Sequence, residues 1–453
     1  MIDSNSATSM SPTPLGKHRW GKIILLIIAT LVFIAVAIFF IPSLLGIFFK
    51  DIDPIDYSDF SLKKVNVSDN ENAYFDLIKL DNLIYEPEGK SDAILDIVAG
   101  KIWDENLAEE IVSKNSRAFE YFSEAARKPK FQDPAAVDPL NITPNTILPN
   151  MNVWRRMSRL SAIRAIQLAK RGKDKEAMEE TLNSIKIGQK IQESQAPLIE
   201  YLVAMSMKSI GLETLQKINA SSKLKGSELS QYAQELNQFY ENEDGAFNAF
   251  KTEYHMISRG LDAISRGELL LGDEVSGPSI KAITKLSNQF NYYYHPNETK
   301  ALFAGYTRVQ IKTVLAPCSA VKEIEIPQLA PQSYIKLYLT ENAIGKILHD
   351  VVASSLTSVS KNKCQEDLLV AATQTIIAIK AFTNENRNYP ASLNELVPRY
   401  LPSIPQDPFG DKALKYSMNK KIIYSVGRDM QDTGGSTGDD WRQMSDPTFE
   451  IDF

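Results

Sequence analysis

The 453-residue sequence predicts a mainly α-helical protein with an N-terminal transmembrane helix, a helical ectodomain and a small C-terminal α+β domain with a short antiparallel sheet. Three observations predict this fold class: an uncharged apolar run near the N-terminus, apolar residues at helical spacing through the centre, and shorter alternating segments near the C-terminus. The expected parts are a disordered cytoplasmic tail at 1–22, the transmembrane helix at 23–49, a linker at 50–69, the helical ectodomain at 70–360 and the α+β domain at 361–453.

The apolar run extends from Ile23 to Phe49 and contains no charged residue. About 20 apolar residues in a helix cross a hydrocarbon core of about 30 Å, whereas a cleaved signal peptide has a shorter apolar region followed by small residues. Lys17, Arg19 and Lys22 precede the run, and basic flanks favour the cytoplasmic side. The sequence therefore predicts a single-pass protein of the bacterial inner membrane, with a cytoplasmic N-terminus and a periplasmic ectodomain.

The whole chain has a formal net charge of -6. An acidic protein has no electrostatic reason to bind nucleic acid, so we expect no nucleic-acid partner. Cys318 and Cys364 are its two cysteines, and both lie on the side that is predicted to be exported. An oxidising compartment and an even number of cysteines favour a disulfide between them, with two buried free thiols as the alternative.

The centre of the chain has the clearest helical periodicity. Residues 154–170 and 176–193 each carry one apolar stripe, and a polar turn that contains Gly172 separates them. This pattern predicts a helical hairpin, and a third helix follows from 198 to about 215. Further helical patterns lie at 70–80, 91–102, 107–127, 228–270 and 334–360.

The pattern changes after Lys363. Apolar residues at helical spacing predict one helix that ends near Asn384, and a short helix at 392–400 follows. Two apparent strands at 413–418 and 422–426 flank a tight polar turn. The segment after them is rich in glycine and aspartate.

Three motifs in this region, at 388–398, 405–410 and 424–435, resemble the C-terminal domain of the major pseudopilins of type II secretion systems. The resemblance implies a long helix packed on a small antiparallel sheet, and a calcium-binding loop. The loop would contain Asp429 and Asp432, with Asp439 or Asp440 as further oxygen donors. Carboxylates on a flexible loop suit calcium, although aspartate and glycine also build ordinary exposed turns.

The N-terminal half departs from that family, because the apolar run lacks the early glutamate of a pseudopilin. As a whole, the chain resembles uncharacterised bacterial single-pass envelope proteins more closely. We therefore do not expect it to be processed or to polymerise as a pseudopilin.

Catalytic patterns are nearly missing from the sequence. His255, His295 and His349 belong to no His-Glu-x-x-His pattern, and no Gly-x-Ser-x-Gly elbow occurs. We interpret His295, beside three tyrosines, as a packed turn residue and predict no catalytic residues. The expected function is a membrane-anchored, non-enzymatic interaction or scaffold protein with a protein partner, associated with secretion or pilus-type machinery. The alternative is a periplasmic hydrolase with a cleft in the helical ectodomain.

Overall fold

The computed structural model describes residues 17–134, 151–240, 244–266, 292–321, 326–355, 358–410, 412–438, 440–451 and 453. The chain forms two compact units. Unit 1 comprises Met1–Pro54, Leu270–Thr299 and Gln328–Leu348, and unit 2 comprises Ile55–Leu269, Lys300–Pro327 and His349–Phe453.

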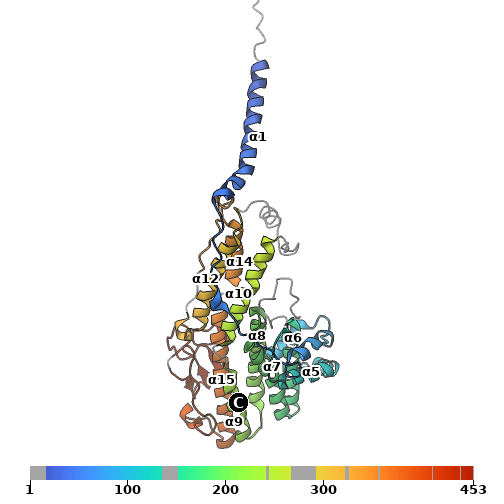
Figure 1. Cartoon of the computed structure of the whole chain (residues 1–453). Helices are drawn as coiled ribbons and strands as arrows, with labels where there is room; N and C mark the ends of the chain where they lie inside the picture. Colours follow the sequence, from blue (N-terminus) through green and yellow to red (C-terminus); the bar gives the residue numbers. More distant parts are fainter. Residues whose placement is uncertain are drawn as a thin grey trace, which may run out of the picture. The chain divides into compact units, whose positions relative to one another are not determined.

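The structure is mainly helical with a small sheet near the C-terminus, and this coarse fold class is confirmed (Figure 1). The α-helices are α1 (Lys17–Phe48), α2 (Tyr74–Leu77), α3 (Ser91–Ala99), α4 (Glu105–Lys114), α5 (Ser116–Arg127), α6 (Met151–Lys170), α7 (Asp174–Gln192), α8 (Leu198–Ser221), α9 (Gly226–Glu235), α10 (Asp244–Ser265), α12 (Pro296–Val314), α13 (Tyr334–Tyr338), α14 (Ala343–Ser355) and α15 (Val359–Asn386). Short 3-10 turns are η1 (Ser58–Phe60), η2 (Ile78–Asn82), η4 (Leu236–Phe239), η5 (Cys318–Ala320), η6 (Leu393–Leu396) and η7 (Trp441–Gln443).

The predicted hairpin is present as α6 and α7, with α8 as the third helix. Gly172 has a φ of +73° in the turn, a conformation that glycine adopts without a Cβ penalty. Glycines also bring α7 and α8 together. A Cβ at Gly188 would lie 2.7 Å from the Ala204 carbonyl oxygen, and one at Gly211 would lie 2.6 Å from Cγ1 of Ile185. Larger residues at either glycine would therefore push the two helices apart.

The described part of unit 2 contains three hydrophobic cores, and the two largest share α7 and α8. One core gathers buried residues from α2 to α8, including Trp154, which is fully buried. The other core joins α7, α8 and α9 to α15 and to the segments that follow it, from Leu393 to Ile451. Helix α15 therefore shares its core with helices from before residue 360, the expected domain boundary.

The sheet contains three antiparallel strands in the order β1-β2-β3. They are β1 (Lys415–Ser417), β2 (Ile422–Tyr424) and β3 (Thr448–Glu450). Opposite Ile423 lie Tyr416 on one side and Phe449 on the other, and the side chains of Ile423 and Phe449 belong to the same core as α15. The sequence analysis predicted β1 and β2, which flank a tight polar turn, but not β3, which no such turn marks.

Unit 1 contains α1, α13 and the tyrosine-rich turn before α12. The Phe49 and Tyr292 rings meet edge to face with their centroids 5.7 Å apart. Tyr292 and Tyr293 accept backbone hydrogen bonds from Asn342 and Ile344, both at 3.0 Å, through their carbonyl oxygens. Two segments that are about 50 residues apart in sequence are thus joined like neighbouring strands.

The membrane prediction is corrected by the structure. A spanning helix needs about 20 consecutive apolar residues, and among the residues that the structure describes no helix is both long enough and apolar enough. A single-pass inner-membrane protein with a periplasmic ectodomain is therefore not supported. Residues 1–16 of the predicted cytoplasmic tail lie outside the described residues, and the rest of that tail begins α1.

Candidate functional site

The pseudopilin resemblance assigns four aspartates to calcium, and the structure describes three of them, Asp429, Asp432 and Asp440. Asp432 pairs with the Lys415 ammonium at 3.1 Å, and the hydrogen bond from this group lowers the pKa of the Asp432 carboxyl. Asp429 is exposed, and Asp440 accepts a hydrogen bond from the first residues of η7. Asp439 lies outside the described residues. Nothing in the described part indicates calcium, so that prediction stays a prediction.

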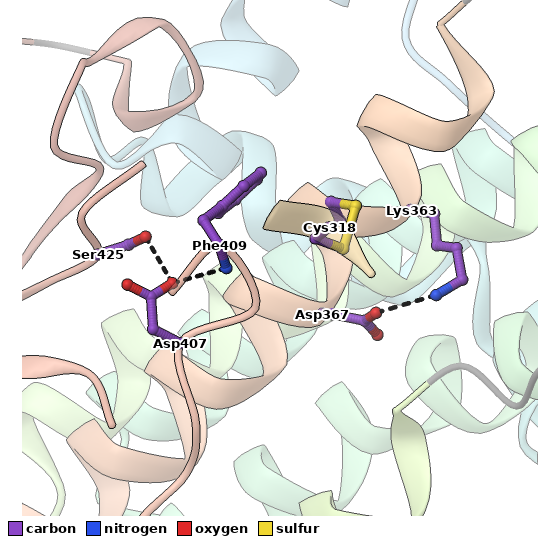
Figure 2. The surroundings of a disulfide bond; sticks show 7 residues. Cys318, Lys363, Asp367, Asp407, Phe409 and Ser425 are labelled. Carbon is purple, nitrogen blue, oxygen red and sulfur yellow. Dashed lines mark hydrogen bonds and ion pairs between the residues drawn. A yellow bond between two sulfur atoms is a disulfide. The ribbon is translucent and has the colours of Figure 1, made fainter. Parts of the chain in front are cut away.

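Two other aspartates hold this region together, and the sequence analysis missed their role. Asp446 is fully buried and accepts hydrogen bonds from the backbone and hydroxyl of Thr433 and from the Gly435 backbone. Asp407 is nearly buried and accepts from the Ser425 hydroxyl at 2.7 Å and from two backbone amides (Figure 2). The Gly/Asp-rich loop is thus stabilised by buried carboxylates that satisfy backbone donors.

Cys318 of η5 and Cys364 of α15 form a disulfide with Cα atoms 5.6 Å apart (Figure 2). The pairing is the one that the sequence favoured. An ion pair between Lys363 and Asp367, at 3.3 Å, lies beside the bond on α15. The disulfide joins the segment after α12 to the long helix in the core.

The three histidines occupy different surroundings. His255 donates to the Phe60 carbonyl oxygen at 2.9 Å, and His349 packs against two aromatic rings. His295 is buried, as expected for a packed turn residue. Its Nδ1 atom, however, lies close to two glutamate carboxylates.

A groove runs along the C-terminal half of α7 in unit 2. It consists of two cavities of about 330 and 590 Å³, and these share Pro129, Lys190 and Glu193. The α7 groove is lined by Val65, Val67, residues 126–133, Asn183, Lys186, Gln189, Lys190, residues 193–196, Glu235, Gln238, Phe239 and Asn248. Its walls therefore come from the segment before α2, the segment after α5, the end of α7, and the η4 and α10 regions.

Side-chain amides fix the walls of this groove. The Gln132 amide accepts a hydrogen bond from the Val67 backbone at 2.9 Å and donates to the Val65 carbonyl at 2.7 Å. The Asn72 amide contacts Gln132 in the same way, accepting from its backbone N–H at 2.9 Å and donating to its carbonyl at 2.7 Å. Each amide makes the pair of bonds that a neighbouring strand would make, so both wall segments are held extended.

A buried carboxyl pair lies behind the groove. Asp133 lines the groove, and Glu200, in the first turn of α8, is fully buried. Burial raises the pKa of Glu200 well above its usual value, and the negative charge of Asp133 acts in the same direction. The fold therefore favours the protonated form of Glu200.

Two further groups beside the pair and the groove have shifted pKa values. Burial raises the pKa of Glu253 to about 7, while a hydrogen bond from the Leu198 backbone opposes the shift. Lys190 donates to the carbonyl oxygens of Ala125 and Ala126 at the end of α5. Burial lowers the pKa of Lys190 to about 8, with a smaller contribution from Lys186. Shifted titratable groups beside a cleft are typical of functional sites, although structural networks produce them too.

Sequence patterns did not indicate this site. Asp133 and Glu200 lie in different segments, and nothing in their spacing predicts that they meet. Comparison of the chain with protein families, with curated proteins and with solved structures finds no match.

Replacing Glu200 with glutamine is expected to reduce the pH dependence of stability. The pKa of Glu200 is higher in the folded state than in the unfolded state, where it is 4.5. Protonation of Glu200 therefore contributes fully to the stability of the fold when the pH is below 4.5. That stability is lost as the pH rises toward the folded pKa, by about 1.4 kcal/mol per pH unit. The glutamine amide stays neutral at every pH, so the variant should gain stability relative to wild type between pH 5 and pH 8.

The measurement is the urea-unfolding free energy of both proteins across this pH range. Glu193→Gln, an exposed change in the same groove, is the matched control and should leave the slope unchanged. An unchanged slope in Glu200→Gln would show that folding does not raise the pKa of Glu200.

Proposed function

We propose that this chain is a non-enzymatic interaction protein whose α7 groove binds an extended, acidic segment of a partner protein. The observation that carries this proposal is a pair of adjoining cavities, with three lining residues in common, whose wall segments are held by side-chain amides. Preformed walls reduce the ordering cost of binding. The secretion or pilus setting rests on the pseudopilin resemblance alone and remains part of the proposal.

Unit 2 binds residues 60–67 of its own chain through their backbone groups, and this supports the proposal that the ligand is an extended segment. We call these residues the clamped segment. His255 and Lys251 of α10 donate to the carbonyl oxygens of Phe60 and Ser61, at 2.9 and 3.2 Å. Gln195 donates to the Lys63 carbonyl at 2.8 Å. Like the hydrogen bonds from Gln132, these contacts are made to the backbone of the clamped segment and not to its side chains. The row of contacts continues into the open groove.

The charge of the groove favours an acidic ligand. Five cationic side chains line it, namely Arg127, Lys128, Lys130, Lys186 and Lys190, against three carboxylates, namely Asp133, Glu193 and Glu235. This local excess of positive charge occurs in a chain with a net charge of -6. Such a patch attracts negatively charged segments and orients them, with an effect that weakens as salt increases.

A display library of acidic and basic peptides of equal length tests the proposal on the full chain. We expect acidic peptides to be selected, and we expect Arg127→Glu to weaken the best of them by about tenfold, which corresponds to about 1.4 kcal/mol. Arg127 is exposed, so the change should not impair folding. Affinity should also fall with salt.

The control variant is Lys175→Glu, which lies on α7, is exposed and does not line the groove. It changes the net charge of the chain by the same amount and should leave peptide affinity unchanged. Equal losses in both variants would indicate a general charge effect, and selection of basic peptides would contradict the proposal.

The raised pKa of Glu200 beside Asp133 favours a second candidate, a hydrolase in which Glu200 acts as the acid and Asp133 as the base. Only Asp133 lines the groove, however, and Glu200 is fully buried. Substrate would reach one carboxyl and not the other, so we rank this function below peptide binding. Turnover of a peptide selected on the groove, abolished by Asp133→Asn, would reverse the ranking.

A further inference from the structure

Unit 1 contains one group of three metal-ligating side chains from two separate segments. His295 precedes α12, Glu298 is in the first turn of that helix, and Glu341 precedes α14. Their ligating atoms all lie within 4.8 Å of one another. Within the described ranges of the chain, this is the only such group of three or more histidine, cysteine and acidic residues.

From this geometry we infer that His295, Glu298 and Glu341 bind a first-row divalent cation of the zinc type. Nδ1 of His295 lies 3.1 Å from a Glu298 carboxylate oxygen and 3.4 Å from a Glu341 oxygen. Zinc binds nitrogen and oxygen ligands at about 2.0–2.1 Å, which places two ligands of a tetrahedral ion about 3.4 Å apart. The distances between the ligating atoms are therefore already close to those between the ligands of a zinc ion.

Hydrogen bonds alone do not explain why two carboxylates lie beside the same nitrogen atom of His295. The Nδ1 atom carries at most one proton, so it donates well to one carboxylate, while two approach it. Nε2 of His295 is buried and has no hydrogen-bond partner among the described residues. A cation bound at Nδ1 would be shared by all three side chains and would offset both negative charges.

The backbone around the cluster is fixed by a second layer of contacts. The carbonyl oxygen of His295 accepts from the Thr299 backbone at 2.9 Å, and its N–H donates to the Asn342 side chain at 3.0 Å. The Asp51 carboxylate accepts from the Glu298 backbone at 2.9 Å. Contacts of this kind hold metal ligands in position and contribute to affinity.

The exposure of the cluster and the chemistry of its ligating atoms indicate which kind of cation it would bind. His295 is buried, whereas the side chains of Glu298 and Glu341 are 29% and 33% exposed, so one side of the cluster is open to water. Three protein ligands with an open position are the arrangement of zinc sites that keep a bound water. The imidazole favours zinc and neighbouring transition metals over magnesium and calcium, which prefer oxygen ligands alone.

The test uses the full chain, without an added histidine tag and stripped with a chelator. Titration calorimetry with Zn²⁺ should show one bound ion, and Glu298→Gln and Glu341→Gln should each weaken it by at least about tenfold. Both residues are partly exposed, so the variants should fold, and circular dichroism checks this. Co²⁺ in place of Zn²⁺ should give visible absorption bands that His295→Ala removes.

Glu176→Gln, at an exposed glutamate of α7 outside the cluster, is the control and should bind Zn²⁺ like wild type. Zinc binding that is equal in wild type and both cluster variants would mean adventitious surface binding and would overturn the inference. So would the lack of stoichiometric binding, or an equal preference for Mg²⁺. None of these results depends on the α7 groove.

Discussion

Replacing Lys208 with methionine is expected to lower the free energy of unfolding by about 3–5 kcal/mol, the usual cost of breaking a buried ion pair. Lys208 on α8 is fully buried, and its ammonium lies 2.5 Å from the Glu366 carboxylate on α15. It also donates to the side chains of Gln189 and Gln192 and to the Phe239 carbonyl, at 2.6, 2.8 and 2.9 Å. Methionine fills the space of the lysine stem but removes the hydrogen bonds to these acceptors and leaves the Glu366 carboxylate with only the hydrogen bond from Gln192.

The effect should depend on pH in a defined direction. Burial raises the pKa of Glu366, and the neighbouring Lys208 ammonium opposes this shift. Without the ammonium the Glu366 pKa rises further, so the folded variant takes up a proton more readily than the unfolded one. Its stability deficit should therefore shrink as the pH is lowered toward 5, because Glu366 is then neutral.

Urea unfolding of the full chain at pH 7 and pH 5 provides the measurement. The double variant Lys208→Met/Glu366→Gln removes both charges and should recover part of the loss. Lys175→Met, at an exposed position of the neighbouring helix, should stay within about 0.5 kcal/mol of wild type. A loss at Lys208 as small as that of the control would mean that the ion pair does not stabilise the core.

The helices could be predicted from the sequence, because the helical spacing of apolar residues is visible within one short segment. The stripes in 154–170 and 176–193 correspond to α6 and α7 within a few residues, and the helix predicted to end near Asn384 is α15. Periodicity reports which face of each helix is buried and not which helix lies against it. For this reason the sequence did not predict that α15 shares one core with α7, α8 and α9.

The sites were not predictable, because they depend on pairs of polar residues that are distant in sequence. Lys208 and Glu366 are separated by more than 150 residues, and each looks like an ordinary charged position on a helix. The acidic loop shows the limit of composition in another way. Its aspartates are close in sequence, yet Asp432 pairs with Lys415 and the buried carboxylate is that of Asp446. Composition shows which ligands are available, whereas convergence is a property of the fold.

The linker predicted at 50–69 is another case in which the sequence did not reveal contacts with distant residues. Its acidic, irregular sequence suggested a passive connection, but residues 60–67 are clamped to unit 2 through their backbone groups. Backbone contacts leave no trace in the residue types of the segment that is held. The side chains that make them, such as Gln195 and His255, gave no periodic or motif signal either.

Removing the disulfide is expected to lower the free energy of unfolding by about 4 kcal/mol. The bond between Cys318 and Cys364 spans 46 positions of sequence, and closing a loop of this length restricts the unfolded chain by about that amount in the chain-entropy model. The double variant Cys318→Ala/Cys364→Ala is preferred to serine, because Cys364 is buried among apolar residues and a hydroxyl there would add its own cost.

Urea unfolding of the wild type and the double variant, each with and without reductant, separates the bond from the side chains. Reductant should bring the wild type close to the variant and leave the variant unchanged. Cys318→Ala alone should lose nearly as much as the double variant, because it breaks the bond while keeping the buried Cys364 side chain. If the single variant lost much less than the double variant, the core contacts of Cys364 and not the covalent link would be the main source of stability. Hydrogen exchange should then show little change at η5, whereas loss of a stabilising link should increase exchange at η5 more than in the middle of α15.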